Sequence, residues 1–413
     1  MQLNERLLAG PPIDGRAESM AEHHRRLGHL PDLPAGALLN ALDATGLLGR
    51  GGAGFPVGKK WRAIAEGHAS GKPVIVANGA EGEPESAKDR VLMAHRPHLV
   101  IDGAILAART LGADRVELYL GREHTGAVAA MKAAVDQRPK AERSLLHVVE
   151  APIGYVAGES TAVVHYVNSK DARPTMTPPR MSDRGVRNRP TLVQNVESLA
   201  HSALIARYGP DWFRERGRGA NRGTALVTIA GPVLHEGVAE IDLGMPLSEL
   251  VELAGGLTGN VHAVLVGGYF GIWAPIEAAW NVPLDPASLK AAGLTFGCGL
   301  VRILDRRTCG VDYSARIMDF LAAGSAMQCG PCKYGLADLA TASGRVASLT
   351  GKSTDMHDIE RWTGLVTGRG ACRHPDGAAQ QMSSALAVFA DDFASHAQRR
   401  RCLARGALAG ALR

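Results

Sequence analysis

The sequence predicts an α/β protein with three parts, residues 1–220, 221–300 and 301–413. In the first part, apolar strand-like runs alternate with helical runs, which is typical of a layered α/β fold. The second part combines short strands with one helix, which indicates a small β-grasp-like domain. The third part is mostly helical, since its apolar residues recur at spacings of three and four.

The expected strands and helices of each part follow in chain order. The strands of the first part are expected at Val74–Ala77, Arg115–Leu120 and Leu146–Glu150, and its clearest helices at Leu38–Leu48, Val100–Leu111 and Thr125–Gln137. The second part contains expected strands at 224–232, 237–241 and 261–266 and a helix at 246–254. The third part contains expected helices at 313–323 and 334–349.

Composition and charge exclude several classes of protein. The 413 residues carry a modest net charge of +5, and 46% of them are hydrophobic. Charge is spread along the chain apart from Arg399–Arg401, which we expect to be a solvated tail. No apolar run reaches membrane-spanning length, and the N-terminus lacks the basic and apolar regions of a signal peptide. We therefore expect a cytoplasmic protein that neither crosses a membrane nor binds nucleic acid.

The most informative motif is a basic, glycine-rich loop at residues 49–61, which ends on a tryptophan. Glycine lets the backbone approach an anion closely, and arginine and lysine supply countercharge, so the loop indicates a phosphate cradle. Gly49, Gly51 and Gly54 also satisfy the spacing G-x-G-x-x-G. A dinucleotide fingerprint of that type follows a strand, whereas here a helix precedes the loop and the first strand comes after it. A plain glycine-rich turn is the remaining alternative.

Three further polar patches stand beside predicted strand ends or helix starts. They are Asn78–Pro84, Gly154–Ala162 and Asn188–Glu197. The first directly follows an expected strand, and open α/β sheets bind ligands at the carboxyl ends of their strands. In the second, Gly158 and Glu159 come before an expected helix start, which favours phosphate. A solvated acidic turn is the alternative for the first patch.

The chain has six cysteines, at positions 298, 309, 329, 332, 372 and 402. Cys329 and Cys332 form a C-x-x-C pair, which in a cytosolic chain indicates metal or redox chemistry. The segments on both sides of this pair are predicted helices, so a thioredoxin-like active site is not expected.

Taken together, the four patches resemble the flavoprotein subunit of respiratory complex I, which accepts hydride from NADH and has relatives in NAD-dependent hydrogenases and formate dehydrogenases. The resemblance covers roughly residues 40–395, with the motifs in family order. It implies a Rossmann-like FMN-binding domain, an SLBB-like β-grasp domain and a helical bundle with an iron–sulfur cluster. The function implied is FMN-dependent oxidation of NADH or NADPH, with single electrons leaving through the cluster.

The resemblance also implies site residues. Positions that match family residues around FMN are Gly49, Arg50, Gly51, Gly52, Lys60, Asn78, Glu81, Gly158, Glu159 and Asn195. Glu83 and Tyr155 match residues on the face where nicotinamide stacks on the flavin, and Phe55 matches an aromatic residue against the dinucleotide.

The cluster motif departs from the family pattern of C-x-x-C-x-x-C and one distant cysteine. Ala326 occupies the first position, which leaves Cys329, Cys332 and Cys372. Four-iron clusters normally take four thiolates, so the site has a non-cysteine ligand, holds a three-iron cluster or holds none. The candidates for a fourth ligand are His374, Asp376, Ser325 and Cys309, whereas Cys298 and Cys402 are expected to have no role.

The residues expected around the nicotinamide also depart from the family pattern. Ala63 and Thr177 replace family aromatic or basic residues, Arg180 stands beside the double proline, Ser160 replaces a carboxylate, and Ala80 replaces an aspartate of the flavin loop. Three functions stay open: an NAD(P)H dehydrogenase, a ferredoxin-linked electron-transfer subunit that keeps FMN without NADH, and a non-catalytic docking subunit. The partner expected for the first two is a ferredoxin-like or other redox subunit, which can belong to a membrane-bound complex.

Overall fold

The structure is a computed structural model that describes residues 5–13, 15–34, 36–67 and 71–404. The chain divides into two compact units. The first comprises residues 1–227 and 238–245, and the second comprises residues 228–237 and 246–413. The three-part boundaries expected from the sequence stay a prediction.

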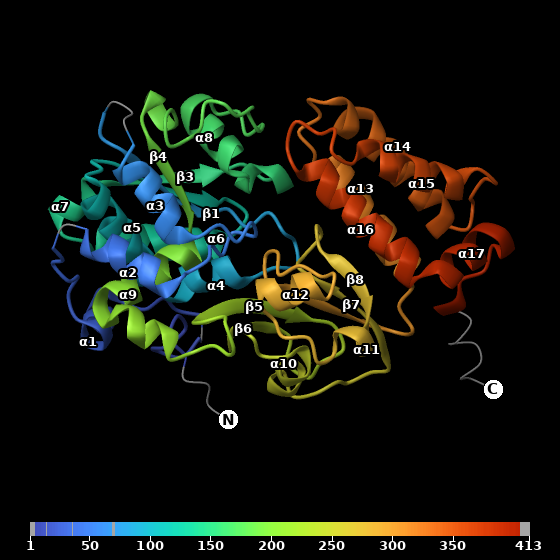
Figure 1. The fold of residues 1–413 in the computed structure, drawn as a ribbon, viewed down its shortest axis with the longest axis horizontal. Coiled ribbons are helices and arrows are strands. Elements are labelled where there is room, and N and C mark those ends of the chain that lie inside the picture. Colours follow the sequence, from blue (N-terminus) through green and yellow to red (C-terminus); the bar gives the residue numbers. More distant parts are fainter. Residues whose placement is uncertain (1–4, 14, 35, 68–70, 405–413) are drawn as a thin grey trace. The chain divides into compact units, whose positions relative to one another are not determined.

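A four-stranded parallel sheet forms the centre of the first unit (Figure 1). Its strands are β1 (Val74–Gly79), β2 (Val116–Gly121), β3 (Leu146–Ala151) and β4 (Thr191–Asn195), in the spatial order β3-β2-β1-β4. β1 and β2 are buried along almost their whole length, as parallel strands covered on both faces are. From β1 the chain adds β2 and β3 on one side, and it then places β4 on the other side. The strand order therefore reverses between β1 and β4.

Helices surround this sheet. They are α1 (Met20–Leu27), α2 (Ala37–Thr45), α3 (Val57–Ala65), α4 (Lys88–His95), α5 (Pro97–Leu111), α6 (Thr125–Asp136), α7 (Lys140–Arg143), α8 (Ser160–Ser169) and α9 (Val196–Arg214), with short 3₁₀ turns at η1 (Tyr155–Gly158) and η2 (Val186–Asn188). α5 is almost fully buried, and it packs against α9. A Cβ atom on Gly103 would lie 2.0 Å from the Leu199 carbonyl oxygen, so glycine at this position permits the close approach of the two helices.

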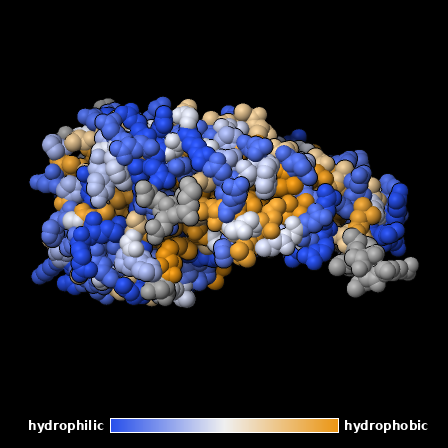
Figure 2. All heavy atoms as spheres, turned by 90° about the horizontal axis from the view of Figure 1, so that it is seen from below, coloured by the Kyte–Doolittle hydropathy of each residue, from blue (hydrophilic) through white to orange (hydrophobic). Residues whose placement is uncertain are grey.

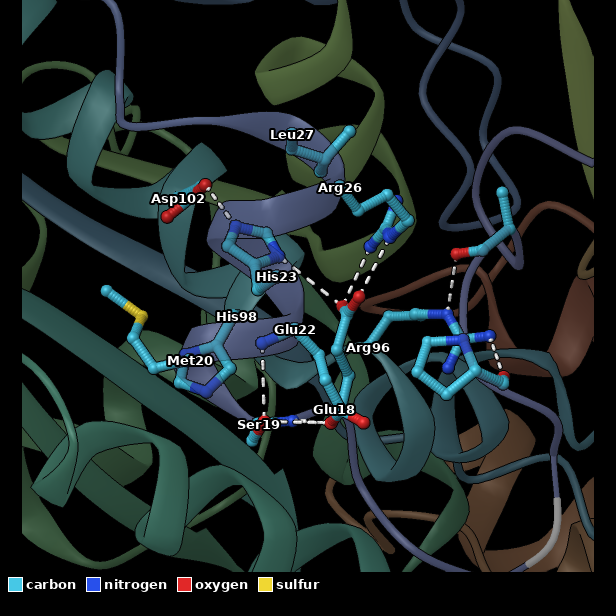
Figure 3. Close-up of polar contacts among 12 residues, drawn as sticks. Glu18, Ser19, Met20, Glu22, His23, Arg26, Leu27, Arg96, His98 and Asp102 are labelled. Atoms are coloured by element: carbon cyan, nitrogen blue, oxygen red, sulfur yellow. Dashed lines mark hydrogen bonds and ion pairs between the residues drawn. The ribbon is translucent and has the colours of Figure 1, made fainter.

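A buried polar cluster attaches α1 to α5 (Figure 3). The His23 ring lies between two carboxylates, with Nε2 2.8 Å from Asp102 Oδ2 and Nδ1 3.4 Å from Glu18 Oε2. Arg26 donates two hydrogen bonds to Glu18, and Arg138 donates one of 2.6 Å to Asp102. Each buried carboxylate thus has cationic partners, which buried charges require.

A five-stranded sheet has the order β6-β5-β9-β7-β8. Its strands are β5 (Thr224–Ala230), β6 (Gly237–Asp242), β7 (Val261–Val266), β8 (Ile272–Pro275) and β9 (Leu300–Asp305), with helices α10 (Leu247–Leu253), α11 (Ile276–Ala279) and α12 (Pro286–Ala291). β5 pairs with β9 in parallel, while β7 is antiparallel to both β8 and β9. This mixed sheet with short helices is the β-grasp-like arrangement expected for the second part.

The chain then forms a helical bundle (Figure 1). Its helices are α13 (Gly310–Ala323), α14 (Ala337–Ala347), α15 (Asp355–Val366), α16 (His374–Val388) and α17 (Ala390–Arg399). A π-helical turn at Pro331–Leu336 leads into α14 and contains Cys332. π-helical turns often occur at functional sites.

Hydrophilic residues cover much of the face shown in Figure 2, with apolar residues between them in smaller groups. None of the helices within the described ranges combines the length and the apolar character that a membrane crossing requires.

Candidate functional site

The glycine-rich loop lies where the strand order of the parallel sheet reverses. Asn78 at the end of β1 and Asn195 at the end of β4 are partners in the strand register. Gly51 lies against Asn195, since a Cβ atom on this glycine would be 3.3 Å from the Asn195 Cβ. The loop is closed at its base by a hydrogen bond of 2.9 Å from the Gly49 amide to the Phe55 carbonyl. Open α/β sheets bind ligands at such a reversal, outside the carboxyl ends of the strands.

Two glycines give the loop its shape. Gly52 and Gly54 have φ values of +100° and +63°, which residues other than glycine rarely adopt. Gly51 and Gly52 are exposed, so their backbone amides are open to a ligand. An exposed glycine backbone beside a buried sheet edge fits the phosphate end of a nucleotide.

Lys60 supplies the positive charge of this site. It lies in the first turn of α3, where burial lowers the pKa of its amine, and its ammonium donates a hydrogen bond to the Val193 carbonyl of β4. Among the residues that the structure describes, no carboxylate lies within ion-pair distance of Lys60. A largely buried cation with a carbonyl as its partner fits a site that receives an anion.

Arg50 differs from the sequence-based expectation, because its guanidinium points into the protein. Its side chain is buried, with Nη2 2.9 Å from the Thr224 carbonyl oxygen and Nε 3.6 Å from Glu197 Oε1. Its backbone amide donates to Ser198 Oγ at 2.9 Å. Arg50 therefore anchors the loop to α9, and only its backbone can face a ligand in the loop.

A buried ion network lies directly behind the loop that follows β1. Lys88 Nζ is 2.7 Å from Asp89 Oδ1 and 2.9 Å from Glu197 Oε2, and Asn195 Nδ2 donates to Asp89 Oδ2 at 2.7 Å. Burial alone lowers the pKa of Lys88, but the adjacent Asp89 and Glu197 carboxylates raise it above its usual range. Lys88 is thus held as a cation. Sequence reasoning missed this network, although the charged pair 88–89 next to a predicted site loop was a signal.

Glu81 belongs to the same region. Its carboxylate accepts a hydrogen bond of 2.5 Å from Ser86 Oγ and bonds of 3.3 and 3.2 Å from the Asp89 and Arg90 amides at the start of α4. Burial, with repulsion from Asp89, raises the pKa of Glu81. The carboxylate therefore holds the loop after β1 against α4.

The turn η1 lies very close to the loop that follows β1. Asn78 Nδ2 donates to the Gly158 carbonyl at 2.9 Å, and a Cβ atom on Gly158 would be 2.8 Å from the Ala80 carbonyl oxygen. Gly82 is equally restricted, with its Cβ position 2.8 Å from the Tyr155 carbonyl oxygen. Glu159 caps α8 by accepting bonds from the amides of residues 161 and 162. The helix start expected after Glu159 is present at Ser160, and the one expected within the patch Asn188–Glu197 is at Val196.

The two residues predicted for the nicotinamide face lie together. Tyr155 Oη donates to Glu83 Oε2 at 3.3 Å, and the Glu83 side chain is 7% exposed. Phe55 is 55% exposed, so its ring has a free face for stacking. The residues that depart from the family pattern on this side, Ala63, Thr177 and Arg180, are all exposed.

Cys329, Cys332 and Cys372 come together at one end of the helical bundle. Burial and the nearby Cys329 and Cys372 thiols raise the pKa of the Cys332 thiol to about 12, while the nearby Ser325 side chain lowers it. The four groups are therefore neighbours. Neighbouring cysteine thiols are the ligands that iron–sulfur clusters take.

The other fourth-ligand candidates have different surroundings. His374 Nε2 lies 2.7 Å from the Leu321 carbonyl oxygen, and the ring packs against Phe270. Asp376 accepts bonds from the Gly368 amide and from Arg373. Cys309 precedes α13, whereas Cys329 follows it, and fourteen helical residues span about 21 Å. Ser325 lies near Cys332.

Three family models match the chain. A model described as the Nuo51 FMN-binding domain matches residues 42–203, one for the SLBB domain matches residues 226–268, and one for the NADH-ubiquinone oxidoreductase-F iron-sulfur binding region matches residues 312–396. The second F subunit of NADH-quinone oxidoreductase in Rhizobium meliloti is 33% identical over 382 residues, which cover 88% of this chain and 90% of that protein. The chain belongs to the F-subunit family of NADH-quinone oxidoreductases.

Two further proteins are similar over most of this chain. The F subunit of NADH-quinone oxidoreductase in Streptomyces coelicolor is 31% identical over 88% of this chain and 84% of its own length. The crystal structure of an NAD+-reducing NiFe-hydrogenase in the H2-reduced state matches with a TM-score of 0.80 and 30% identity, over 87% of this chain. This chain spans 62% of that hydrogenase chain.

Membership of the F-subunit family confirms the fold, the FMN cofactor and the iron–sulfur cofactor expected from the sequence. The α/β fold with an FMN-binding domain, an SLBB domain and a helical iron–sulfur region is confirmed. FMN and an iron–sulfur cluster are the cofactors of these regions, and the residues described above fit both groups. The roles of the individual residues stay predictions.

Proposed function

We propose that this chain is the FMN-containing and iron–sulfur-containing subunit of a redox complex and that it oxidises NADH. The observation that carries the proposal is the site at the reversal between β1 and β4, where the glycine loop, Lys60 and the paired Asn78 and Asn195 meet. The relatives named above are NADH-quinone oxidoreductase subunits, and the matched hydrogenase reduces NAD+.

When bound, FMN would accept a hydride from NADH and release the two electrons singly to an iron–sulfur cluster. The residues of the chain would bind and orient the reactants. Lys60 and the open amides of Gly51 and Gly52 would hold the phosphate. Asn78 and Asn195, fixed by their hydrogen bonds to Gly158 and Asp89, would present their polar side chains to the flavin.

Glu83 and Tyr155 would orient the nicotinamide. Their hydrogen bond fixes both side chains beside η1, and Phe55 offers an exposed ring for stacking against the dinucleotide. In this proposal, the exposed residues Ala63, Thr177 and Arg180 make the nucleotide contacts weaker than aromatic or lysine side chains would.

Cys329, Cys332 and Cys372 would ligate the iron–sulfur cluster, with Ser325 as the fourth ligand. The proposal for Ser325 rests on the nearness of its side chain to Cys332. Electrons would pass from the cluster to another redox subunit, because the relatives are named as subunits of larger assemblies. We propose a peripheral location on a membrane-bound complex.

Anaerobic titration of the purified, FMN-loaded protein with NADH and NADPH tests the proposal. We expect NADH to bleach the flavin absorption band, and we expect Glu83→Gln and Tyr155→Phe to raise the NADH concentration required without changing the FMN content. The exposed Glu66→Gln at the C-cap of α3 serves as the control. If neither nucleotide bleaches the flavin but a reduced ferredoxin does, the chain is a ferredoxin-linked subunit and NADH oxidation is refuted.

A further inference from the structure

Three metal-ligating side chains meet in the helical bundle at a place with no assigned role. The ligand atoms of Cys309, His396 and Cys402 all lie within 4.8 Å of one another. Cys309 Sγ is 3.4 Å from His396 Nε2. Among the residues that the structure describes, no other group of three or more His, Cys, Asp or Glu side chains meets this distance. Cys309 and Cys402 lie outside the region matched by the iron–sulfur family model, residues 312–396.

The local structure brings Cys309 to this place as the N-cap of α13. Its sulfur accepts a hydrogen bond of 3.4 Å from the Asp312 amide. The Cys309 sulfur therefore lies at the N-terminus of a fourteen-residue helix.

Cys402 reaches the same place because the chain turns back after α17. Arg400 adopts a positive φ of +50°, and two hydrogen bonds join Ser395 to Arg401, one of them 2.8 Å from Ser395 Oγ to the Arg401 carbonyl oxygen. The turn places the buried Cys402 beside His396 of the preceding helix.

His396 is oriented as metal-binding histidines are. Its Nδ1 lies 3.2 Å from the Val346 carbonyl oxygen at the end of α14. A proton on Nδ1 satisfies this contact and leaves the Nε2 lone pair directed toward Cys309. Metal-ligating histidines commonly donate their second ring nitrogen to a carbonyl in this way.

We propose that Cys309, His396 and Cys402 form a zinc site. Two thiolates and one imidazole are ligands that select zinc over calcium or magnesium, which prefer oxygen. In a tetrahedral zinc site, a sulfur and a nitrogen ligand are about 3.5 Å apart, which the observed 3.4 Å between Cys309 and His396 matches. Cys309 is only partly buried, so a water molecule can take the fourth position.

The zinc site is separate from the iron–sulfur cysteines. Cys332 lies just before α14, whereas Val346, which contacts His396, lies near its end. Fourteen helical positions separate Cys332 from Val346, a span of about 21 Å. Zinc would therefore join the start of α13 to α17 and the segment after it, and this role does not depend on NADH oxidation.

Metal analysis of the full-length, anaerobically purified protein without a histidine tag tests the proposal. We expect about one zinc ion per chain, retained through dialysis. Cys309→Ser, His396→Gln and Cys402→Ser should each lower zinc affinity at least about 10-fold. Cys298→Ser is the matched control, because Cys298 lies outside the group, and it should keep its zinc.

Iron and FMN contents are measured on the same samples. Unchanged iron and FMN in a zinc-deficient variant show that the variant is folded and that the two metal sites are distinct. If a variant loses zinc, iron and FMN together, X-ray absorption at the zinc edge of the wild-type protein identifies the zinc ligands. We expect two sulfur ligands at about 2.3 Å and one nitrogen ligand at about 2.0 Å.

Three outcomes would overturn the zinc site. They are a wild-type protein that holds no zinc after growth with added zinc, variants that bind zinc as tightly as the wild type, and a Cys309–Cys402 disulfide found in the protein as isolated from cells.

Discussion

Arg50 and Lys60 come from the same basic loop but have opposite surroundings. Arg50 has Glu197 and the Thr224 carbonyl as partners inside the protein, while Lys60 has the Val193 carbonyl. A buried charge without an opposite charge destabilises the folded state and is retained where it binds a ligand. At the scale of single residues, this contrast distinguishes Arg50, which anchors the loop, from Lys60, the cation proposed to bind the ligand.

Replacing Lys60 with methionine tests this assignment. We expect Lys60→Met to weaken FMN binding about 10- to 100-fold, because a charge-assisted contact to phosphate is lost. We also expect the FMN-free protein to be as stable as the wild type or more stable, because a poorly compensated buried charge is removed. FMN fluorescence titration and thermal unfolding of the FMN-free protein measure the two effects. The exposed neighbour Lys59→Met is the control and should change neither.

Ser325 allows a second residue-scale prediction, which concerns the iron–sulfur site. Ser325→Ala removes the hydroxyl proposed as the fourth ligand near Cys332, so we expect a lower iron content per chain and an altered electron paramagnetic resonance spectrum. The exposed Ser353→Ala should change neither. Wild-type iron content and spectrum in Ser325→Ala would show that the hydroxyl is not a ligand.

At the scale of elements, the site depends on how closely η1 approaches the loop after β1. Gly158 is required there because a side chain would press against the Ala80 backbone, which cannot rotate away as a flexible side chain can. The glycine in this turn is thus set by packing between two segments about 80 residues apart in the sequence.

Gly158→Ala should therefore damage the site through the backbone. We expect η1 to move away from Ala80, with destabilisation of about 1–3 kcal/mol and reduced FMN occupancy. Gly126→Ala is the matched control, because Gly126 lies in α6 with open space around its Cβ position. It should be neutral or stabilising by up to about 1 kcal/mol. Urea unfolding and the ratio of FMN to protein measure the outcome, and equal effects of the two variants would contradict the packing argument.

At the scale of the whole molecule, buried titratable groups decide how stability depends on pH. The fully buried His98 has its pKa lowered to about 4 by burial and by the nearby Arg138 and His23 charges. Although burial favours the neutral acid of Glu18, hydrogen bonds from His23 and Arg26 lower its pKa to about 2 (Figure 3). In both cases the unfolded chain takes up a proton at higher pH than the folded protein, so acid favours unfolding.

We predict two stages of acid destabilisation. The contribution of His98 is complete above its ordinary pKa of 6.5 and falls by up to about 3 kcal/mol as the pH drops toward 4. That of Glu18 is complete above its ordinary pKa of 4.5 and is lost as the pH drops toward 2. The free energy of unfolding, measured by urea titration between pH 8 and pH 4, follows the first stage.

The variant His98→Gln separates the contribution of His98 from other groups. Its stability should fall less steeply between about pH 6.5 and pH 4 than that of the wild type. Some slope should remain, because burial also lowers the pKa of His201. The exposed His357→Gln should keep the wild-type slope, and an unchanged slope in His98→Gln would contradict the prediction.

Most of the fold could be predicted from the sequence because its elements have strong local patterns. The runs Val74–Ala77 and Leu146–Glu150 are strands, and the helix expected at Thr125–Gln137 is α6. The bounds shifted where caps decide them, as in α2, which ends at Thr45 rather than at Leu48 because Gly46 adopts a left-handed conformation.

The sequence predicted which segments form the candidate site, but it did not predict which way their side chains point. The glycine loop, Asn78 and Asn195 were found from their positions beside strands and helices. The inward direction of Arg50 and the buried Lys88–Asp89–Glu197 network depend on contacts between segments more than 100 residues apart, which no local pattern contains.

The sequence by itself determined the α/β class, the flavoprotein family and the two cofactors, because motif order and strand and helix patterns are properties of the chain. Only the tertiary structure decided that Arg50 points into the protein, that Ser325 lies near Cys332, and that Cys309 and Cys402 meet His396. The physical reason is that burial, ion pairing and metal ligation depend on distances across space, which folding sets between segments far apart in the sequence.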